Sequence, residues 1–326
     1  MMKAMLQEGY GSSEMLRLVD RVIPEPGPGE VTVEVAAAGL DAGLVHLLEG
    51  RPFPVRLAMP LRGGRVLGLD CAGTVHAVGE GVTDYAVGDK VFGVTVTGDG
   101  ALAENARAST AKLAPKPRGL SFIEAAAIPV SATTALRAVR DAAGVQSGQR
   151  VLVLGAAGGV GHFAVQIAKN LGAEVIGACS TGKLQLVRSI GADQVIDYTT
   201  GDPLKEGPFD AIIDTGGHRR LRQLRRALQP TGALVLVGAE PEAAPLGGMG
   251  RSLAAALLNP FTRQKLVMLA SSEDRQALLD LTELVDRGAL RPVIHRTASL
   301  EEAPEAITGL GRGSGTAKTV VELQQI

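Results

Sequence analysis

The stretch RVLVLGAAGGVGHFAVQIAKNLG, residues 150–172, decides the fold of this chain. Its first part, RVLVLG (150–155), is almost wholly apolar, as in a strand covered on both faces of a sheet. The glycine-rich GAAGGVG (155–161) follows, and HFAVQIAKNLG (162–172) then has apolar residues at helical spacing. A strand, a glycine turn and a helix in this order favour a βαβ unit that binds a dinucleotide. The alternative is a tight structural turn without a ligand.

The turn matches the pattern Ala156-x-Gly158-x-x-Gly161, an alanine-for-glycine form of the dinucleotide fingerprint. Small residues let the backbone approach a pyrophosphate, and the first amides of the following helix favour negative charge. Gly161 also lets the helix pack closely on the strand. The residues expected to contact the cofactor here are Ala157, Gly158, Gly159, Val160 and Gly161.

Strands and helices alternate after this turn, which predicts a parallel sheet. The predicted strands are 174–179, 194–198, 209–214, 233–239 and 265–271, and the predicted helices are 183–191, 221–228 and 273–288. Just before the sheet, LSFIEAAAIPVSATTALRAV (120–139) reads as a helix broken at Pro129.

The first part of the chain has a different rhythm, with short Val-rich segments broken by Gly and Pro. This pattern predicts a twisted, mostly antiparallel β unit, in which residues 68–82 form a hairpin or a bulged strand pair. KTVVEL (318–323) repeats the same rhythm, so we expect the tail to return to this unit. The predicted fold class is therefore α/β, with a first domain of residues 1–122 completed by 291–326 and a parallel-sheet domain of residues 123–290.

Composition excludes several classes of function. The 326 residues carry a net charge of −1 and no Trp, which disfavours nucleic-acid binding. The basic run HRRLRQLRR (218–226) is interpreted as a solvated amphipathic helix. Two cysteines make no disulfide framework or structural zinc site, and no signal peptide or span of 18 apolar residues is present. We expect a cytoplasmic protein with no bound metal and no membrane contact.

The acid that usually follows the second strand of a dinucleotide-binding unit is missing. GACSTGK (177–183) has Ser180, Thr181 and Lys183 in its place. A carboxylate there would bind the ribose 2′-hydroxyl and repel a 2′-phosphate, whereas hydroxyls and an ammonium group suit the phosphate. These three residues predict NADPH as the cofactor; the alternative is an ordinary helix N-cap. Tyr198 either lines the adenine or 2′-phosphate site or is a half-buried strand end.

Several segments together resemble a known family. GAAGGVGHFAVQIAKNLGAEVIGACST, LVRSIGADQVIDY, GLDCAGTVHAVGEGVTDYAVGDKVFG and GTAKTVVEL are similar to the zinc-independent medium-chain dehydrogenase/reductase superfamily, in its quinone oxidoreductase-like branch. The resemblance implies a GroES-like β domain made from both chain ends, a Rossmann domain between them and an NADPH cleft at their junction. It also implies a homodimer in which the strand at 265–271 pairs across the interface.

The zinc-dependent relatives have a catalytic Cys near position 41 and Gly-His-Glu near 68–70. This chain has Asp41 and Gly68-Leu69-Asp70 instead, and zinc-assisted alcohol oxidation needs three protein ligands. Without a metal, the family resemblance implies hydride transfer from NADPH to a small-molecule acceptor, either a quinone or an α,β-unsaturated carbonyl. The alternatives are a specialised biosynthetic enoyl reductase and a non-catalytic NADPH-binding sensor or interaction protein.

The acceptor side departs from the family pattern. An Asn commonly stands at the place of Asp41, an Asp at that of Leu44 and an aromatic residue at that of Asn105. Three candidate proton donors remain, each with a structural alternative: Asp41 or a helix cap, His46 or a packed helix histidine, and Asp70 or a buried structural carboxylate.

The remaining cofactor residues come from two further segments. In PVSATTAL (129–136), Thr133 and Thr134 resemble residues of the family that touch the nicotinamide and phosphates. Val237 and Gly238 follow a parallel strand and are expected to approach the nicotinamide, since ligands bind at the carboxyl ends of such strands. Asp214 either contacts the cofactor or closes a turn at Gly216.

Overall fold

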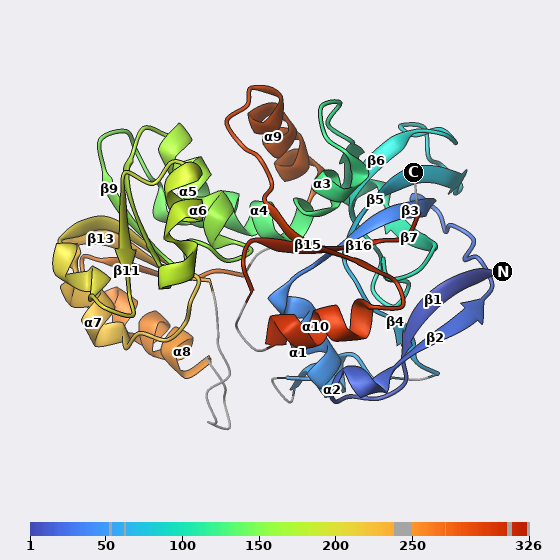
Figure 1. The fold of residues 1–326 in the computed structure, drawn as a ribbon, viewed down its shortest axis with the longest axis horizontal. Helices are drawn as coiled ribbons and strands as arrows, with labels where there is room; N and C mark the ends of the chain where they lie inside the picture. The colour runs from blue at the N-terminus through green and yellow to red at the C-terminus, as the bar shows by residue number, and fades with distance from the viewer. Residues whose placement is uncertain (52–53, 62, 238–248, 271, 312–314, 325–326) are drawn as a thin grey trace. The chain divides into compact units, whose positions relative to one another are not determined.

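The computed structural model describes the chain except residues 52–53, 62, 238–248, 271, 312–314 and 325–326 (Figure 1). The chain forms two compact units, one of Met1–Thr133 with Ser272–Ile326 and one of Thr134–Ser271. The sequence analysis set the borders at 122 and 290. Helix α9 (Arg275–Asp286) therefore belongs to the first unit, where it packs against β8 (Leu113–Pro115).

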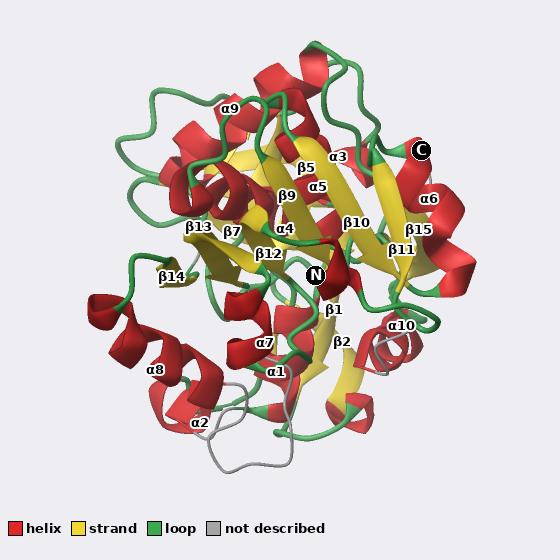
Figure 2. Ribbon diagram, turned by 90° about the vertical axis from the view of Figure 1, so that its left-hand side faces the viewer, coloured by secondary structure: helices red, strands yellow, loops and turns green. Residues whose placement is uncertain are grey.

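The second unit is built on a six-stranded parallel sheet of order β11-β10-β9-β12-β13-β14, and Figure 2 shows its central strands side by side. This confirms the predicted Rossmann-type fold class. The strands are β9 (Arg150–Leu154), β10 (Glu174–Cys179), β11 (Gln194–Asp197), β12 (Phe209–Asp214), β13 (Leu228–Leu236) and β14 (Lys265–Met268). The apolar runs form them because both faces of the sheet are covered, as the burial of Val151, Ile176 and Ile212 shows.

Helices flank this sheet. They are α4 (Pro129–Leu136), whose C-terminal part lies in this unit, α5 (Gly161–Asn170), α6 (Leu184–Ser189), α7 (Leu221–Arg226) and α8 (Met249–Leu258), with a π-helical stretch at Arg137–Ala143. The predicted break at Pro129 is confirmed, because α3 (Phe122–Ala126) ends before it and α4 begins on it. The sequence analysis had no prediction for α8.

The first unit contains two sheets, of order β2-β1-β4 and β15-β16-β3-β5-β6-β8, with β7 paired to β3. Most pairs among the described strands are antiparallel, as predicted, and β15 pairs with β16 in parallel. The strands besides β8 are β1 (Met2–Gln7), β2 (Leu16–Arg21), β3 (Glu30–Leu40), β4 (Arg65–Val66), β5 (Asp70–Val78), β6 (Lys90–Val94), β7 (Asn105–Ser109), β15 (Ile294–Ser299) and β16 (Lys318–Glu322). The helices besides α3 and α9 are α1 (Ala42–Glu49), α2 (Pro54–Ala58) and α10 (Ala303–Gly311).

The prediction of a hairpin or strand pair in residues 68–82 was wrong. This segment holds the single strand β5, which pairs with β3 on one edge and with β6 on the other. Gly73 allows a close approach of β3 rather than a turn, because a Cβ there would lie 2.1 Å from the Glu34 carbonyl oxygen. The register between β3 and β5 is irregular at two places. Between the pairs Thr32–Ala77 and Val33–Val75 the extra residue is His76 of β5, and between the pairs Val35–Gly73 and Ala37–Ala72 it is Ala36 of β3.

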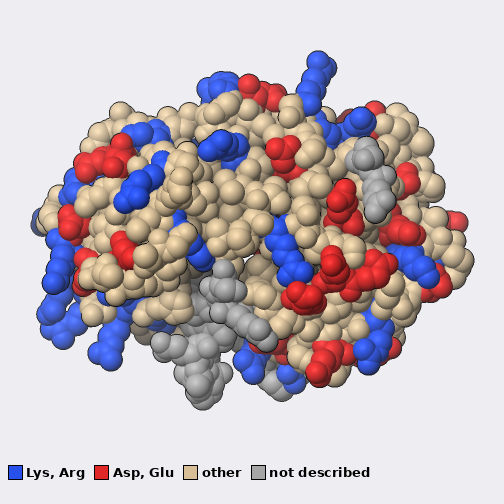
Figure 3. Space-filling view, viewed as in Figure 1, with Lys and Arg blue, Asp and Glu red and all other residues tan. Residues whose placement is uncertain are grey.

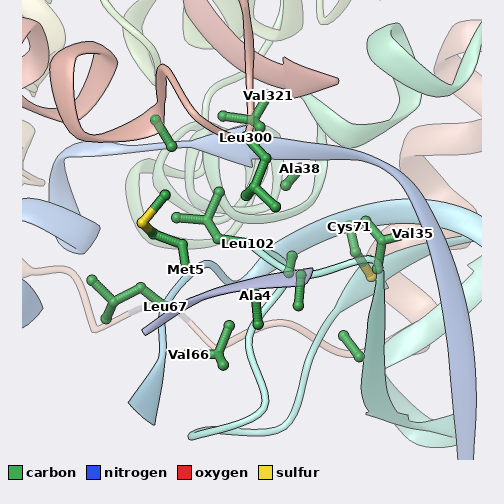
Figure 4. Packing of buried hydrophobic residues seen from close by; sticks show 14 of the residues in the cluster. Ala4, Met5, Val35, Ala38, Val66, Leu67, Cys71, Leu102, Leu300 and Val321 are labelled. Carbon is green, nitrogen blue, oxygen red and sulfur yellow. The ribbon is translucent and has the colours of Figure 1, made fainter. Parts of the chain in front are cut away.

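Both ends of the chain contribute to the core of the first unit. β16 pairs with β3, and Val321 and Leu300 pack in the same cluster as Met5, Val35 and Leu102 (Figure 4). This confirms the predicted GroES-like domain made from both chain ends. Within the described residues, no helix has the length and apolar character needed to cross a membrane.

Candidate functional site

The glycine-rich turn leaves β9 with the geometry that the fingerprint requires. Gly155 has a φ of +76°, a conformation that side chains disfavour. Its amide and that of Ala156 donate to the Ala178 carbonyl oxygen at 3.1 and 3.0 Å, so the turn is fastened to the end of β10. A Cβ on Gly161 would lie 2.1 Å from the Gly155 oxygen, which leaves no room for a side chain. The sequence alone could not show that contact.

The outer part of the turn can receive a ligand. Gly158, Gly159 and Val160 are partly exposed, and α5 begins directly after them at Gly161. A Cβ on Gly158 would meet only the Gly155 oxygen, at 3.2 Å. Amides at the start of a helix, next to a glycine with open space around its Cα, fit the pyrophosphate of a dinucleotide.

Thr215 is a functional candidate that sequence reasoning missed. Its hydroxyl donates to the Leu154 carbonyl oxygen at 2.8 Å and lies 3.3 Å from that of Gly155. A Cβ on Gly155 would lie 2.5 Å from this hydroxyl oxygen. Thr215 therefore supports the start of the turn from the end of β12. The sequence could have indicated Thr215 by its place just after a predicted parallel strand, because the carboxyl ends of parallel strands lie at the edge of the sheet where ligands bind.

The helix-cap alternative for the segment after β10 is not realised. Ser180 occupies the N-cap position of a short 3₁₀ turn, Thr181–Lys183, but its side chain makes no capping hydrogen bond. Burial lowers the pKa of the Lys183 ammonium group. Ser180, Thr181 and Lys183 thus lie together at the carboxyl end of β10, where the second ribose of a dinucleotide would bind.

A carboxylate also lies beside this segment. The hydroxyls of Thr181 and Thr199 each donate to Asp197 at 2.6 Å, and the Thr199 amide donates to it at 2.9 Å. These hydrogen bonds hold the pKa of the Asp197 carboxyl below its ordinary value. Asp197 ends β11, and sequence reasoning missed it, although its position at a strand end was the available signal. Tyr198 follows it, with half of its surface exposed and its amide bonded to the Cys179 oxygen.

At the end of β13, Val237 is half-buried and its amide donates to the Asp214 carbonyl oxygen at 3.0 Å. Gly238 lies outside the described residues. The Asp214 carboxylate accepts from the Gly217 amide at 3.0 Å and pairs with Arg251. Its side chain therefore closes a turn, which is one of the two roles that the sequence left open.

The predicted nicotinamide-binding threonines lie on α4, and both are buried. The Thr133 hydroxyl is completely buried and has no hydrogen-bond partner among the described residues. A buried hydroxyl without a partner is costly, so this group fits a carboxamide or phosphate oxygen of a bound cofactor. Thr134 lies next to it and is 9% exposed.

Asp70 forms a buried ion pair with Lys318. The distance from Oδ2 to Nζ is 3.2 Å, Oδ1 accepts from the Val130 amide at 2.8 Å, and Lys318 also donates to the Ser131 hydroxyl at 3.0 Å. Burial raises the pKa of Asp70 to about 7, because desolvation outweighs the opposing effect of Lys318. The carboxylate is fully buried, which is the structural alternative that the sequence left open.

Asp41 and His46 lie on α1. Asp41 is the N-cap, and its side chain accepts from the Leu44 amide at 3.1 Å. His46 is half-buried, and its carbonyl oxygen accepts from the amides of Gly50 and Arg51 near the end of the helix. The structure thus realises the capping alternative for Asp41, while the proton-donor role of either residue stays a prediction.

Two further positions bear on the acceptor side. Leu44 is buried in the core of the first unit. Asn105 is 7% exposed, and its Oδ1 has no hydrogen-bond partner among the described residues. Among the residues that the structure describes, no three His, Cys, Asp or Glu side chains are grouped in a way that could hold a metal ion.

The comparisons with known proteins agree with this geometry. Residues 27–118 match the family model described as alcohol dehydrogenase GroES-like domain, and residues 190–321 match the one described as zinc-binding dehydrogenase. The second description names zinc.

Relatives match over nearly the whole chain. The mitochondrial NAD(P)H oxidoreductase RTN4IP1 of Bos taurus is 32% identical over 360 residues, covering 99% of this chain and 89% of the relative. The chloroplast envelope quinone oxidoreductase homolog of Arabidopsis thaliana is 30% identical over 336 residues, covering 99% and 98%. The solved quinone oxidoreductase from Coxiella burnetii superposes with a TM-score of 0.89 at 32% identity, covering 99% of both chains. This chain belongs to the quinone oxidoreductase-like branch of the medium-chain dehydrogenase/reductase superfamily, which is a family of oxidoreductases.

Proposed function

We propose that this protein is an NADPH-dependent, zinc-independent oxidoreductase that reduces a quinone or an α,β-unsaturated carbonyl compound. The observation that carries the proposal is the turn at Gly155–Gly161. Side chains are excluded at Gly161, and the backbone is accessible at Gly158, directly before α5. Bound NADPH would supply the hydride, and the protein would supply binding, orientation and electrostatic support.

The preference for NADPH rests on Lys183 and Ser180. Lys183 brings a positive charge to the end of β10, and the Ser180 side chain is not used as a helix cap. Asp197 opposes them, because its carboxylate accepts the Thr181 proton and repels a phosphate nearby. We expect the positive charge and the Ser180 hydroxyl to prevail, so that NADPH binds more tightly than NADH.

Titration of the protein with NADPH and with NADH, followed by cofactor fluorescence, tests this preference. We expect Lys183→Met to weaken NADPH binding about ten-fold or more while changing NADH binding little, since a charge-assisted phosphate contact is lost. Lys205→Met is the matched control, because Lys205 is an exposed lysine of the same unit. Equal affinity for the two cofactors in the unmodified protein contradicts the NADPH assignment.

On the acceptor side, Thr133 and Thr134 would orient the nicotinamide. Asp41, His46 and Asp70 remain the candidate groups for a proton at the reduced acceptor. Asp70 would require a rearrangement to reach any acceptor, because both of its oxygens are bonded in a buried site. Oxidation of NADPH with a panel of quinones, enals and enones tests the activity. No turnover with any of them, together with tight NADPH binding, would favour the non-catalytic sensor.

A specialised enoyl reductase is the second candidate, and Asn105 favours it. A buried amide oxygen without a partner suits an acceptor that carries a hydrogen-bond donor, whereas a simple quinone has none. A comparison of kcat/KM for a simple quinone with that for amide- or hydroxyl-bearing enoyl compounds separates the two candidates. In this second case, Asn105→Leu should reduce the preference for the donor-bearing acceptor.

We also propose a homodimer that forms through β14. This strand lies at the edge of its sheet, and exposed apolar side chains lie on it and just before it, at Leu253, Leu257, Phe261 and Met268. An edge strand can pair with a strand of a second copy, and on β14 the Leu266 amide already donates to Asn259 Oδ1 at 3.0 Å. Light scattering after gel filtration measures the mass, and Met268→Arg, which places a charge on the exposed edge strand, should give a monomer. The cytoplasmic location expected from the sequence stays a prediction, and the Bos taurus relative is named as mitochondrial.

A further inference from the structure

A group of arginines lies at the opposite end of the six-stranded sheet from the glycine-rich turn. The turn follows the carboxyl end of β9, whereas Pro230 lies near the amino end of β13 and Gln264 directly precedes β14. These strands are parallel, so their amino ends form the edge away from the turn. The arginine group is therefore separate from the dinucleotide site.

The group surrounds a hollow of about 370 Å³. Its lining consists of Arg222, Arg225, Arg226, Pro230, Thr262 and Gln264. This volume lies within the range of small-molecule sites, about 300–1,000 Å³. Pro230 is the one apolar residue of the lining, so the hollow suits a small polar ligand with charge.

Arg225 is held in a fixed position within this lining. Its Nε donates to Gln264 Oε1 at 3.0 Å, and its Nη2 donates to the Thr262 hydroxyl at 3.2 Å. Gln264 in turn donates through Nε2 to the Arg225 carbonyl oxygen at 2.8 Å. Both side-chain partners are neutral, so the guanidinium group is oriented while its charge is not balanced.

The neighbouring arginines also lack an acidic partner. No ion pair between described residues includes Arg222, Arg225 or Arg226, whereas Arg219 on the same segment pairs with Asp202 at 3.1 Å. Arg222 lies three residues before Arg225 and four before Arg226, spacings at which like charges on a helix repel each other. An anion in the hollow would remove this repulsion.

The surrounding sequence is basic although the whole chain is not. Residues 215–270 contain eight Lys and Arg against two Glu, and the whole chain has a net charge of −1. On the face shown in Figure 3, Lys and Arg side chains gather at the lower left, over the part of the second unit that contains α7 in Figure 1. The solvated-helix interpretation of residues 218–226 fits the exposure of Arg222 and Arg226. It does not account for Thr262 and Gln264, which complete the hollow.

We propose that this hollow, which we name the arginine pocket, binds a di- or triphosphate group. Guanidinium groups present planar pairs of N–H donors that match phosphate oxygens, and three of them oppose the charge of a polyphosphate. The Thr262 hydroxyl lies beside them and adds a neutral hydrogen-bonding group. Such a ligand is either a free inorganic polyphosphate or the phosphate end of a nucleotide.

The test uses the full chain and inorganic tripolyphosphate, titrated by calorimetry at constant ionic strength with and without saturating NADPH. We expect saturable binding with the same affinity in both conditions, since the arginine pocket and the cofactor turn lie at opposite ends of the sheet. The Arg222→Gln/Arg226→Gln double variant should lose at least about ten-fold in affinity, because charge-assisted bonds are removed from exposed positions. Its thermal melting and NADPH binding should equal those of the unmodified protein.

Arg263→Gln is the matched control, because Arg263 is an exposed arginine next to Thr262 that does not line the hollow. It should change the affinity less than two-fold. Tighter binding of ATP than of tripolyphosphate, with the same sensitivity to the double variant, supports the nucleotide as the source. Weaker binding of ATP, with the same sensitivity, supports inorganic polyphosphate.

Three results would overturn the proposal. They are no saturable binding of tripolyphosphate, an equal loss in Arg263→Gln and in the double variant, and displacement of tripolyphosphate by NADPH. The second result means a general effect of surface charge, and the third means that the anion occupies the cofactor turn. None of these readouts depends on oxidoreductase activity, so failure of the proposed function is recognised separately.

Discussion

The Thr181 hydroxyl donates a 2.6 Å hydrogen bond to the Asp197 carboxylate, which joins the ends of β10 and β11 beside the predicted 2′-phosphate site. This bond commits the Thr181 proton to an acid, so Thr181 presents lone pairs rather than a donor to the cofactor. At the predicted site, the lone pairs of Thr181 would repel a phosphate, whereas the positive charge of Lys183 would attract it.

Asp197→Asn should therefore shift the cofactor preference toward NADPH. Removal of the carboxylate charge abolishes the repulsion of the 2′-phosphate and weakens the hydrogen bond that holds the Thr181 proton, and we expect about a three- to ten-fold gain in the ratio of NADPH to NADH affinity. Fluorescence titration measures it. Asp286→Asn, an exposed aspartate on α9, controls for the change in net charge. An unchanged ratio would mean that Asp197 lies beyond the influence of the cofactor.

The glycine turn yields two alanine variants with different consequences. Gly161→Ala places a methyl group 2.1 Å from the Gly155 oxygen and should lower the free energy of unfolding by about 1–3 kcal/mol. Gly158→Ala meets only one atom, at 3.2 Å, so the fold should tolerate it, while NADPH binding weakens because the methyl group lies at the accessible part of the turn. Urea unfolding and cofactor titration give both quantities. Equal effects of the two variants on NADPH binding and on the free energy of unfolding would contradict the assignment of Gly161 to packing and Gly158 to cofactor binding.

Thr133→Val should weaken cofactor binding without weakening the fold. The hydroxyl has no partner among the described residues, so its removal relieves a buried polar atom and leaves the free energy of unfolding unchanged or higher by about 1 kcal/mol. The KM for NADPH should rise. Thr282→Val is the control, because its hydroxyl bonds to the Leu278 oxygen within α9. A loss of stability in Thr133→Val with normal KM would show that the hydroxyl has a structural partner instead.

Asp70 should make stability depend on pH near neutrality. Its pKa in the folded protein is about 7 against an ordinary value of 3.8, so the folded state holds this proton more tightly than the unfolded chain. The contribution of the carboxyl group is then largest below the ordinary pKa and is lost as pH rises through the folded pKa, with a slope of at most about 1.4 kcal/mol per pH unit. Urea midpoints at about pH 5.5 and about pH 8 should differ less in Asp70→Asn than in the unmodified protein. An equal difference in urea midpoint for Asp70→Asn and the unmodified protein would mean that Asp70 does not cause the pH dependence.

Asp41 can be assigned by two substitutions. Asp41→Asn keeps an N-cap acceptor for the Leu44 amide but carries no acid, whereas Asp41→Ala loses both. We expect Asp41→Ala to lose about 1 kcal/mol of stability and Asp41→Asn to retain both stability and turnover, as for a helix cap. A large fall in kcat for Asp41→Asn, at unchanged stability, would instead identify Asp41 as the proton donor.

The sequence by itself determined the features that reside in short segments. The apolar run, the glycine turn and the helix of residues 150–172 each follow from local periodicity and glycine conformation, and the structure has them in that order. The segment at 68–82 was misread because its glycines resemble turn residues, while Gly73 in fact allows close contact with a neighbouring strand.

Only the tertiary structure decided how distant residues meet. Lys318 reaches Asp70 across 248 positions of sequence, and Gln264 reaches Arg225 across 39. Thr181 meets Asp197 because β10 and β11 are adjacent and parallel. Hydrogen bonds and ion pairs of this kind depend on strand order and register, which local patterns do not encode. For this reason the sequence predicted a cofactor site at the glycine-rich turn, while the carboxylate beside the predicted ribose site and the arginine pocket came from the fold.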